Sequence, residues 1–372
     1  MSENMDLTQQ NISDIPVVDS SVETPIAILM AVGDSHLDSE NYGYHLDYPK
    51  EALYYEELFN HIAKTEHVTH YVHTGDFVMH KDFSLAYRAK VDDILTRRKQ
   101  LIESRGGEVI HIRGNHDISG KSVTEYDYYA QRGLFVPAVA KPELMIKNSK
   151  GQTVLHAAFR DYKDTAGFIP TGITNIMFAH GHFAFDRILE GNDMPNYGQA
   201  VKISNKRDWE GIDYLICGHI HTEHVMRGQI CGHSCTVHYL PCMSRPAYLK
   251  RFEEGPEAVR EGCVDLIKVY EDRVEIERVP IPFLDNKVCF NMERIMNDAA
   301  KLELSMVDKG RREALKSMAE ELQQYEKRET DPVQQIMTLP NTKEEHKEIV
   351  IDWMSEAKEA LKRGQTPASM SK

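Results

Sequence analysis

Five short motifs rich in aspartate, asparagine and histidine occur in one order along this 372-residue chain, and they constrain its chemistry more than any other feature. In chain order the motifs are Asp34-Ser35-His36, Gly75-Asp76, Gly114-Asn115-His116-Asp117, His180-Gly181-His182 and Gly218-His219-Ile220-His221. Each motif alone occurs by chance in many sequences, whereas the ordered set supplies carboxylate, amide and imidazole groups together. Such a set of oxygen and nitrogen ligands suits two divalent metals that share a bridging carboxylate.

The motifs follow short apolar segments that are typical of buried β-strands. Five such segments are predicted, each ending shortly before one motif: 25–32, 68–73, 108–112, 175–179 and 214–217. Because the carboxyl ends of parallel strands converge at the mouth of an α/β sheet, we expect the motif side chains to meet in space. Helical patterns at 50–64 and 83–104 separate the first strands, and two hairpins follow at 224–239 and 264–280. This order of elements predicts two packed sheets flanked by helices.

Changes in composition divide the chain into three parts. Residues 1–24 are polar and lack periodicity, which is typical of a disordered tail. Residues 25–285 hold every motif and form the predicted main domain, with a small β-hairpin cap near 224–285. Residues 286–372 are rich in charge, with apolar residues at helical spacing, and they predict a C-terminal helical region followed by a polar tail.

Charge and cysteine usage limit the class of protein. The formal net charge of −14 argues against a broadly basic surface, although two bound dications would add about +4 of local charge at the site. Six cysteines without a secretory signal predict reduced thiols and a cytoplasmic location. The apolar run at 26–32 is too short to span a bilayer, so no membrane association is expected. The basic run Arg97-Arg98-Lys99 is expected to be a solvated face.

The order of the five motifs resembles that of the calcineurin-like metallophosphoesterases, over residues 25–285. The resemblance implies an α/β fold, a four-layer α-β-β-α sandwich of two mixed sheets, to which the C-terminal helical appendage is added. It also implies a ligand set divided between two metals that share Asp76, with Asp34, His36 and His221 for one metal and Asn115, His180 and His219 for the other. The expected metal is Mn²⁺, with Fe, Zn or Mg as the alternatives.

Two further residues of the third motif have roles that the resemblance implies. His116 matches the family's non-ligand histidine, which meets the phosphate and can protonate the leaving oxygen. Asp117 matches the acidic residue that often follows it and would orient the His116 imidazole. In the fourth motif, His180 is preferred as the ligand because it ends an apolar strand and precedes a glycine, and His182 stays the alternative.

The sequence around the last motif narrows the expected substrate. The run from Asp208 to His221 resembles the corresponding stretch of SbcD-type DNA repair exonucleases, and Tyr239 to Arg245 is similar to a turn that follows it there. The resemblance implies a metal-dependent nuclease acting in DNA repair or recombination, and we expect Arg113 and Arg245 to contact the nucleic-acid backbone. It also implies that C-terminal helices bind the coiled coil of an SbcC-like partner ATPase, and a homodimer is a further expectation.

Two alternatives stay open on the sequence alone. The same metal core serves small phosphoesters and cyclic nucleotides in this family, so a small-molecule phosphoesterase is the first alternative. The second is a non-catalytic scaffold subunit, for which broken ligand motifs would be expected, whereas all five motifs are intact here.

Overall fold

The computed structural model describes residues 23–41, 45–79, 82–118, 123–164, 166–183, 187–190, 209–230, 232–244, 262–281 and a few positions between 284 and 297. The chain divides into two units, Met1–Met292 and Glu293–Lys372, and every element below belongs to the first. The predicted N-terminal tail and C-terminal helices lie almost wholly outside the described residues. The predicted limits of the three parts of the chain therefore stay predictions.

The first sheet has six strands in the order β13-β12-β1-β2-β3-β4. A parallel set forms its larger part and comprises β1 (Ala27–Val32), β2 (His70–His73), β3 (Val109–His111) and β4 (Val136–Pro137). The hairpin of β12 (Gly262–Val269) and β13 (Val274–Ile281) continues the sheet, with β12 antiparallel to β1. The first three motifs follow β1, β2 and β3.

The second sheet has seven strands in the order β5-β6-β7-β9-β11-β10-β8. Its strands are β5 (Glu143–Lys147), β6 (Thr153–Arg160), β7 (Thr174–His180), β8 (Arg187–Glu190), β9 (Tyr214–Gly218), β10 (His224–Ile230) and β11 (His233–Tyr239). The central strands β6, β7, β9 and β11 are parallel, and the outer strands are antiparallel to their neighbours. Both predicted hairpins are present, and each extends one of the two sheets.

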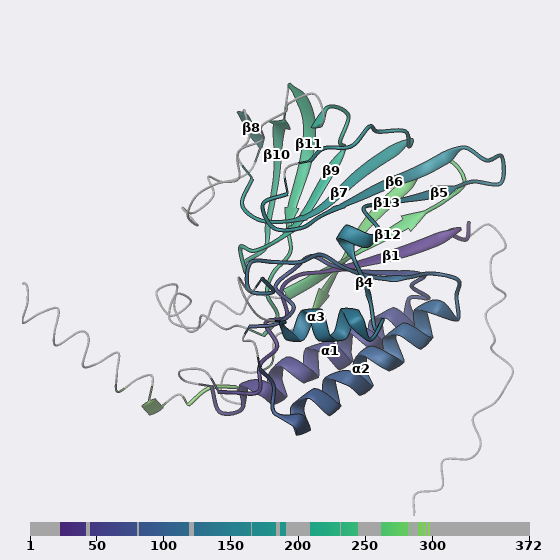
Figure 1. Ribbon diagram of the computed structural model, residues 1–372. Helices are drawn as coiled ribbons and strands as arrows, with labels where there is room; N and C mark the ends of the chain where they lie inside the picture. Colours follow the sequence, from purple (N-terminus) through teal and green to yellow (C-terminus); the bar gives the residue numbers. More distant parts are fainter. Residues whose placement is uncertain are drawn as a thin grey trace, which may run out of the picture. The chain divides into compact units, whose positions relative to one another are not determined.

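In the described part of the chain, three α-helices lie on the outer face of the first sheet (Figure 1). They are α1 (Tyr48–Thr65), α2 (Leu85–Glu103) and α3 (Glu125–Gln131), and a short 3₁₀ helix, η1 (Ala138–Ala140), follows them. Each α-helix begins at a side chain that accepts a hydrogen bond from the first turn, and these caps are Asp47, Ser84 and Thr124. Helix formation is thus specified locally, while tertiary packing of the buried face stabilises each helix.

Alternation along β1 explains how the first sheet packs on both faces. Leu29 and Ala31 point into the core between the two sheets, whereas Met30 and Val32 pack against the helices. The described outer face of the second sheet packs against Trp209 and Phe183. A helical layer and two stacked mixed sheets agree with the predicted metallophosphoesterase fold.

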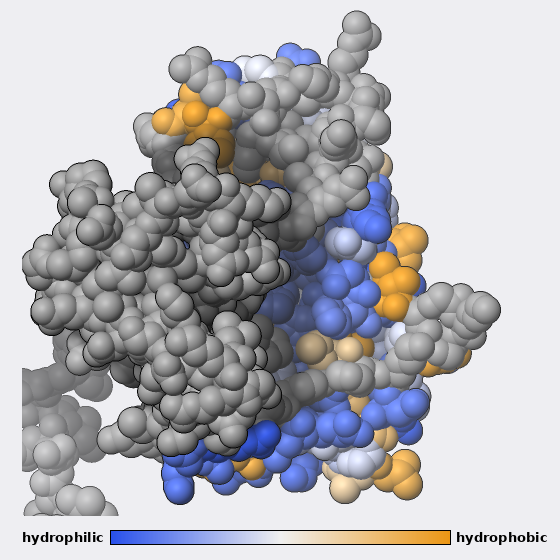
Figure 2. Space-filling view, turned by 90° about the vertical axis from the view of Figure 1, so that its left-hand side faces the viewer, coloured by the Kyte–Doolittle hydropathy of each residue, from blue (hydrophilic) through white to orange (hydrophobic). Residues whose placement is uncertain are grey.

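The described surface in Figure 2 is mainly hydrophilic, with hydrophobic residues in small separate patches. Within the described part of the chain, no helix combines the length and the apolar character needed to cross a membrane.

Candidate metal centre

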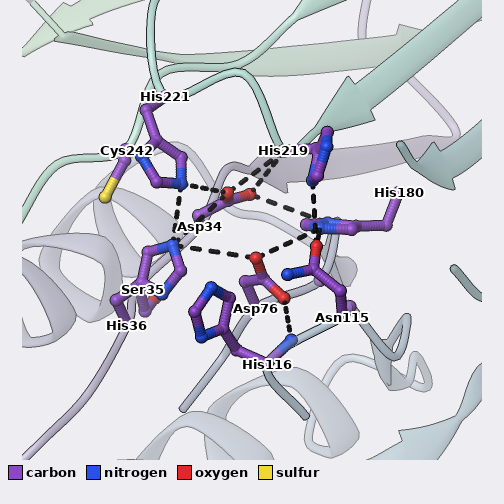
Figure 3. Close-up of polar contacts among 12 residues, drawn as sticks. Asp34, Ser35, His36, Asp76, Asn115, His116, His180, His219, His221 and Cys242 are labelled. Carbon is purple, nitrogen blue, oxygen red and sulfur yellow. Dashed lines mark hydrogen bonds and ion pairs between the residues drawn. The ribbon is translucent and has the colours of Figure 1, made fainter. Parts of the chain in front are cut away.

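The five motifs meet at one edge of the two sheets, and each lies at the end of a strand or in the loop that follows it (Figure 3). The first sheet supplies the loops after β1, β2 and β3, and the second sheet supplies those after β7 and β9. All seven predicted ligands come together there, namely Asp34, His36, Asp76, Asn115, His180, His219 and His221. The site therefore lies at the carboxyl ends of parallel strands, where α/β folds commonly bind ligands.

A left-handed backbone conformation recurs at the candidate ligands. The angle φ is 45° at His36, 50° at Asp76, 94° at His219 and 61° at His221. Each non-glycine residue held in such a sparsely populated region costs about 1–3 kcal/mol, and it persists only where the surrounding structure imposes it. The loops therefore hold these side chains in an arrangement that the backbone alone would not adopt, which is typical of functional sites.

The glycines in the motifs allow the ligands to approach the backbone closely. A Cβ atom at Gly75 would lie 2.4 Å from Nδ1 of His180, and one at Gly218 would lie 2.3 Å from Oδ1 of Asp34. Either contact is far shorter than a van der Waals distance, so any larger residue would displace a ligand. The glycines are needed for the spacing of the site.

The first group of ligand atoms comes from Asp34, His36, Asp76 and His221, and these atoms lie within 4.8 Å of one another. The Nε2 atoms of His36 and His221 face each other at 2.9 Å, and Nε2 of His221 lies 3.3 Å from Oδ2 of Asp34. Two ring nitrogens at this distance need a shared proton or a shared cation between them. The arrangement therefore fits a divalent metal.

The second group contains Asp76, His180 and His219, whose ligand atoms also lie within 4.8 Å of one another. Oδ1 of Asn115 completes the group, at 3.1 Å from Nε2 of His180 and 2.9 Å from Nδ1 of His219. Asp76 belongs to both groups and lies between them in Figure 3, as a bridging carboxylate requires. His182, the alternative in the fourth motif, belongs to neither group.

The two aspartates give the site a negative potential. Burial acts to raise the pKa of Asp34, but His180, His221 and His36 hold it well below its usual value. Burial also opposes ionisation of Asp76, yet His180 lowers the pKa of that carboxyl to about 2. In return, the carboxylates outweigh the burial of His180 and raise its pKa to about 9. A site that holds a proton this strongly also suits a divalent cation in the proton's place.

Backbone groups orient several ligands. Nδ1 of His180 donates a hydrogen bond to the carbonyl oxygen of Thr74 at 2.9 Å, which directs Nε2 towards the site. The backbone N–H of His219 donates to both carboxylate oxygens of Asp34, at 3.0 and 3.1 Å. Because β1 and β9 belong to different sheets, this last contact joins the sheets at the site.

His116 lies at the open side of the site. Its side chain is exposed, and its ring packs edge-on against that of His36, with ring centroids 4.8 Å apart. Its backbone N–H donates to Oδ1 of Asp76 at 2.8 Å, so the loop that carries His116 is anchored to the bridging residue. This position leaves the imidazole accessible to a bound substrate.

The predicted role of Asp117 is wrong in its detail. Its carboxylate does not bond to the imidazole of His116; among the described residues it accepts from the backbone N–H groups of Phe77, Val78 and Gly114. Burial, followed by the charge of Asp76, raises the pKa of Asp117 to about 7, while these three hydrogen bonds oppose the shift. Asp117 therefore ties the second motif to the third and acts on His116 only through the loop.

Of the two arginines predicted to bind substrate, the structure describes Arg113 but not Arg245. The guanidinium of Arg113 pairs with the carboxylate of Asp127 and lies 4.8 Å over the ring of Tyr126, so it braces the third motif against α3. Arg245 lies outside the described residues. The turn before Arg245 packs on the site, because the hydroxyl of Ser244 donates to the carbonyl oxygen of Ser35 at 2.5 Å.

A buried polar network beneath the site was not predicted. The hydroxyl of Ser35, between two candidate ligands, donates to the carboxylate of Glu56. The other oxygen of Glu56 lies 2.8 Å from Nη2 of Arg98. Arg98 is 0% exposed, so the expectation of a solvated basic run is wrong for this residue, although it holds for Arg97. No sequence signal separates the two neighbours, except that Arg98 falls on the apolar face of α2 with Val91 and Leu95.

Comparison with known proteins identifies the family of the chain. The family model for calcineurin-like phosphoesterases matches residues 29–223, slightly more than half of the chain, and every candidate ligand lies within the match. No curated protein matches. Among solved structures, a dimetal phosphatase from Danio rerio is 12% identical with a TM-score of 0.41, covering 70% of this chain and 100% of that chain. A second solved structure is 9% identical with a TM-score of 0.33, covering 68% of this chain and 98% of the other.

Proposed function

Because this chain belongs to the calcineurin-like phosphoesterase family, we propose that it hydrolyses phosphodiester bonds at the two-metal site, with DNA as its substrate. The observation that carries hydrolysis is the sharing of Asp76 between two groups of ligand atoms. The same ligand set argues against a non-catalytic scaffold, because no candidate ligand is missing.

The donor set fits two divalent metals, and we propose Mn²⁺. Asp34, His36 and His221 would hold one ion, while Asn115, His180 and His219 would hold the other, and Asp76 would hold both. When bound, such a pair neutralises the charge of a phosphoryl group and lowers the pKa of the attacking water. Nitrogen and oxygen ligands without a thiolate are compatible with Mn, Fe or Zn.

His116 is the proposed general acid. Its exposed ring beside His36 is placed to hydrogen-bond the phosphate and to give a proton to the leaving oxygen. The hydrogen bond from its backbone to Asp76 keeps the ring in register with the ligands. Asp117 fixes the same loop from below by its bonds to Phe77 and Val78.

The choice of DNA rests on the resemblance of residues 208–221 and 239–245 to SbcD-type exonucleases. Ser244 donates a hydrogen bond to Ser35, and the backbone N–H of Cys242 donates to the carbonyl oxygen of His221, so the described residues 239–244 of that second segment lie beside the site. A cytoplasmic location, a partner ATPase that binds the C-terminal helices and a homodimer belong to the same proposal.

One observation favours a small phosphoester or cyclic nucleotide as the substrate instead. Arg113 directly precedes the third motif. Its guanidinium forms an ion pair with Asp127 and lies over the ring of Tyr126. A guanidinium held in this way has less freedom to follow a phosphate backbone.

To test the proposal, the protein is loaded with Mn²⁺ and incubated in parallel with four kinds of substrate. These are single-stranded DNA, double-stranded DNA, a cyclic nucleotide and p-nitrophenyl phosphate esters. We expect Mn²⁺-dependent DNA cleavage that weakens steeply with added salt, since neutralised phosphates release counterions. Hydrolysis of the small esters without DNA cleavage, alone or with an ATPase partner, would select the small-molecule alternative. Hydrolysis of none would contradict the enzymatic proposal.

Charge reversal locates the DNA-binding surface. We expect Arg245→Glu to weaken DNA cleavage much more than hydrolysis of a small diester, because only the long substrate reaches beyond the metals. Arg113→Glu, if the guanidinium only braces the loop, should reduce both activities equally. Arg132→Glu is the matched control, because Arg132 ends α3 and pairs with Asp92 of α2, as Arg113 pairs with Asp127, but it belongs to none of the five motifs.

A further inference from the structure

A second cluster of metal-ligating side chains shares no residue with the two-metal site. Glu223, His238 and Cys263 each offer one ligand atom within 4.8 Å of the others. Glu223 precedes β10, His238 lies on β11 and Cys263 lies on β12. Because β11 belongs to the second sheet and β12 to the first, the cluster joins the two sheets.

His238 is prepared as a ligand. Its side chain is buried, and its Nδ1 lies 2.5 Å from Oδ2 of Asp265, which is also buried. Nδ1–H therefore donates to the carboxylate and leaves the lone pair on Nε2. Among the described residues, this Nε2 has no hydrogen-bond partner. A buried acceptor without a partner is costly, and a histidine held by a carboxylate is the usual arrangement of a metal ligand.

Cys263 supplies a thiol that is free of any disulfide and only 1% exposed. Burial, together with the charges of Glu223 and Asp265, raises the pKa of this thiol, while Arg278 acts in the opposite direction. Arg278 also pairs with the carboxylate of Glu223. Packing alone would explain a buried thiol, but it would not explain why an unpaired imidazole nitrogen and a carboxylate lie beside it.

We propose that Glu223, His238 and Cys263 bind one Zn²⁺ ion at the junction of the two sheets. A thiolate, an imidazole and a carboxylate form a ligand set that zinc accepts, and three protein ligands leave a fourth position for water. On binding, the Cys263 thiol gives its proton to solvent as the sulfur–zinc bond forms. Glu223 follows His221 by two residues, so this ion would also fix the loop that carries the last motif. Zinc binding at this cluster would be independent of the substrate.

The test uses the full-length protein loaded with Co²⁺, which reports a thiolate ligand by a charge-transfer absorption band in the near ultraviolet. The wild type should show this band and bind three metals per chain, while Cys263→Ser should lose the band and one metal and keep the other two. Cys242→Ser is the matched control, because Cys242 is also buried and lies near His221, and it should keep the band. Asp76→Asn should keep the band while it loses the other two metals.

A wild-type protein that binds two metals and shows no thiolate band would overturn the proposal. A band that persists in Cys263→Ser, or disappears in Cys242→Ser, would assign the thiolate to the two-metal site and overturn it as well. Should Cys263→Ser fail to fold, His238→Gln provides the same comparison. Titration of the wild-type protein with Co²⁺ tests the proposal whether or not these variants fold, because it requires no variant.

Discussion

Replacing Arg98 by methionine is expected to destabilise the protein strongly, because it leaves a buried carboxylate without its counter-charge. Nη2 of Arg98 lies 2.8 Å from Oε2 of Glu56, and its Nε donates to Oδ1 of Asn60 at 2.7 Å. The guanidinium also lies 4.1 Å over the ring of Tyr71. Methionine keeps much of the length of the side chain, so the loss is mainly one of charge and hydrogen bonds rather than of volume.

The magnitude follows from burial. Removing one partner of a buried ion pair costs about 3–5 kcal/mol, because the remaining charge stays desolvated. Arg97, the next residue in the helix, pairs with Glu57 at the surface with its side chain 45% exposed, and such pairs contribute about 0–1 kcal/mol. The double variant Glu56→Gln with Arg98→Met removes both charges and should recover most of the loss.

Urea unfolding of metal-free Arg98→Met and Arg97→Met gives the comparison, since both remove one arginine from α2. We expect the free energy of unfolding to fall at least about 2 kcal/mol further in Arg98→Met. Equal losses in the two variants would refute the argument.

Three other perturbations have distinct expected results. Asp76→Asn should lose both metals and all activity, since two dications about 3.5 Å apart then lack the charge between them; an active variant with two metals by elemental analysis would contradict the bridging role. His116→Ala should keep both metals and lose about 10²- to 10⁴-fold in turnover, whereas loss of metal would identify His116 as a ligand. Burial lowers the pKa of His70 from 6.5 to about 4 in the folded protein. As the pH falls, the His70 imidazole is therefore protonated in the unfolded chain before it is protonated in the folded protein. The stability that the neutral ring contributes is complete above pH 6.5 and is lost towards pH 4, by roughly 3 kcal/mol. Urea unfolding across this window should show a smaller loss in His70→Gln, and an unchanged pH dependence would rule out His70 as the cause.

The positions of the candidate ligands could be predicted because each follows an apolar strand within a few residues. Strand ends and short motifs are local features, so Asp34 and Asp76 could be placed from sequence alone. Strand β6 could not be predicted from the sequence, because His156 and Arg160 interrupt its apolar pattern. In the structure His156 bonds to Thr171 and Arg160 donates to backbone carbonyl oxygens, so both are satisfied in a buried strand.

Local sequence patterns also cannot predict which residue pairs with a buried charge. Glu56 and Arg98 are 42 residues apart in the chain and meet only because α1 packs against α2. The same holds for Asp117, which is adjacent to His116 in sequence but bonds to residues about forty positions earlier. Side-chain direction in a loop depends on such long-range contacts, and sequence spacing does not report it.

The division of the ligands between two sheets makes the separation of the metals depend on the core between those sheets. Asp34 and Asp76 are fixed to the first sheet and His180 and His219 to the second, while Leu29 and other apolar side chains fill the space between. Protein interiors are packed densely, so a change in the volume of this core shifts one sheet against the other. Selectivity among metals of different radius would then respond to substitutions well away from any ligand. Relative affinities for Mn²⁺ and Zn²⁺ in a Leu29→Ala variant would measure that dependence, and unchanged relative affinities would show that the loops alone determine the spacing.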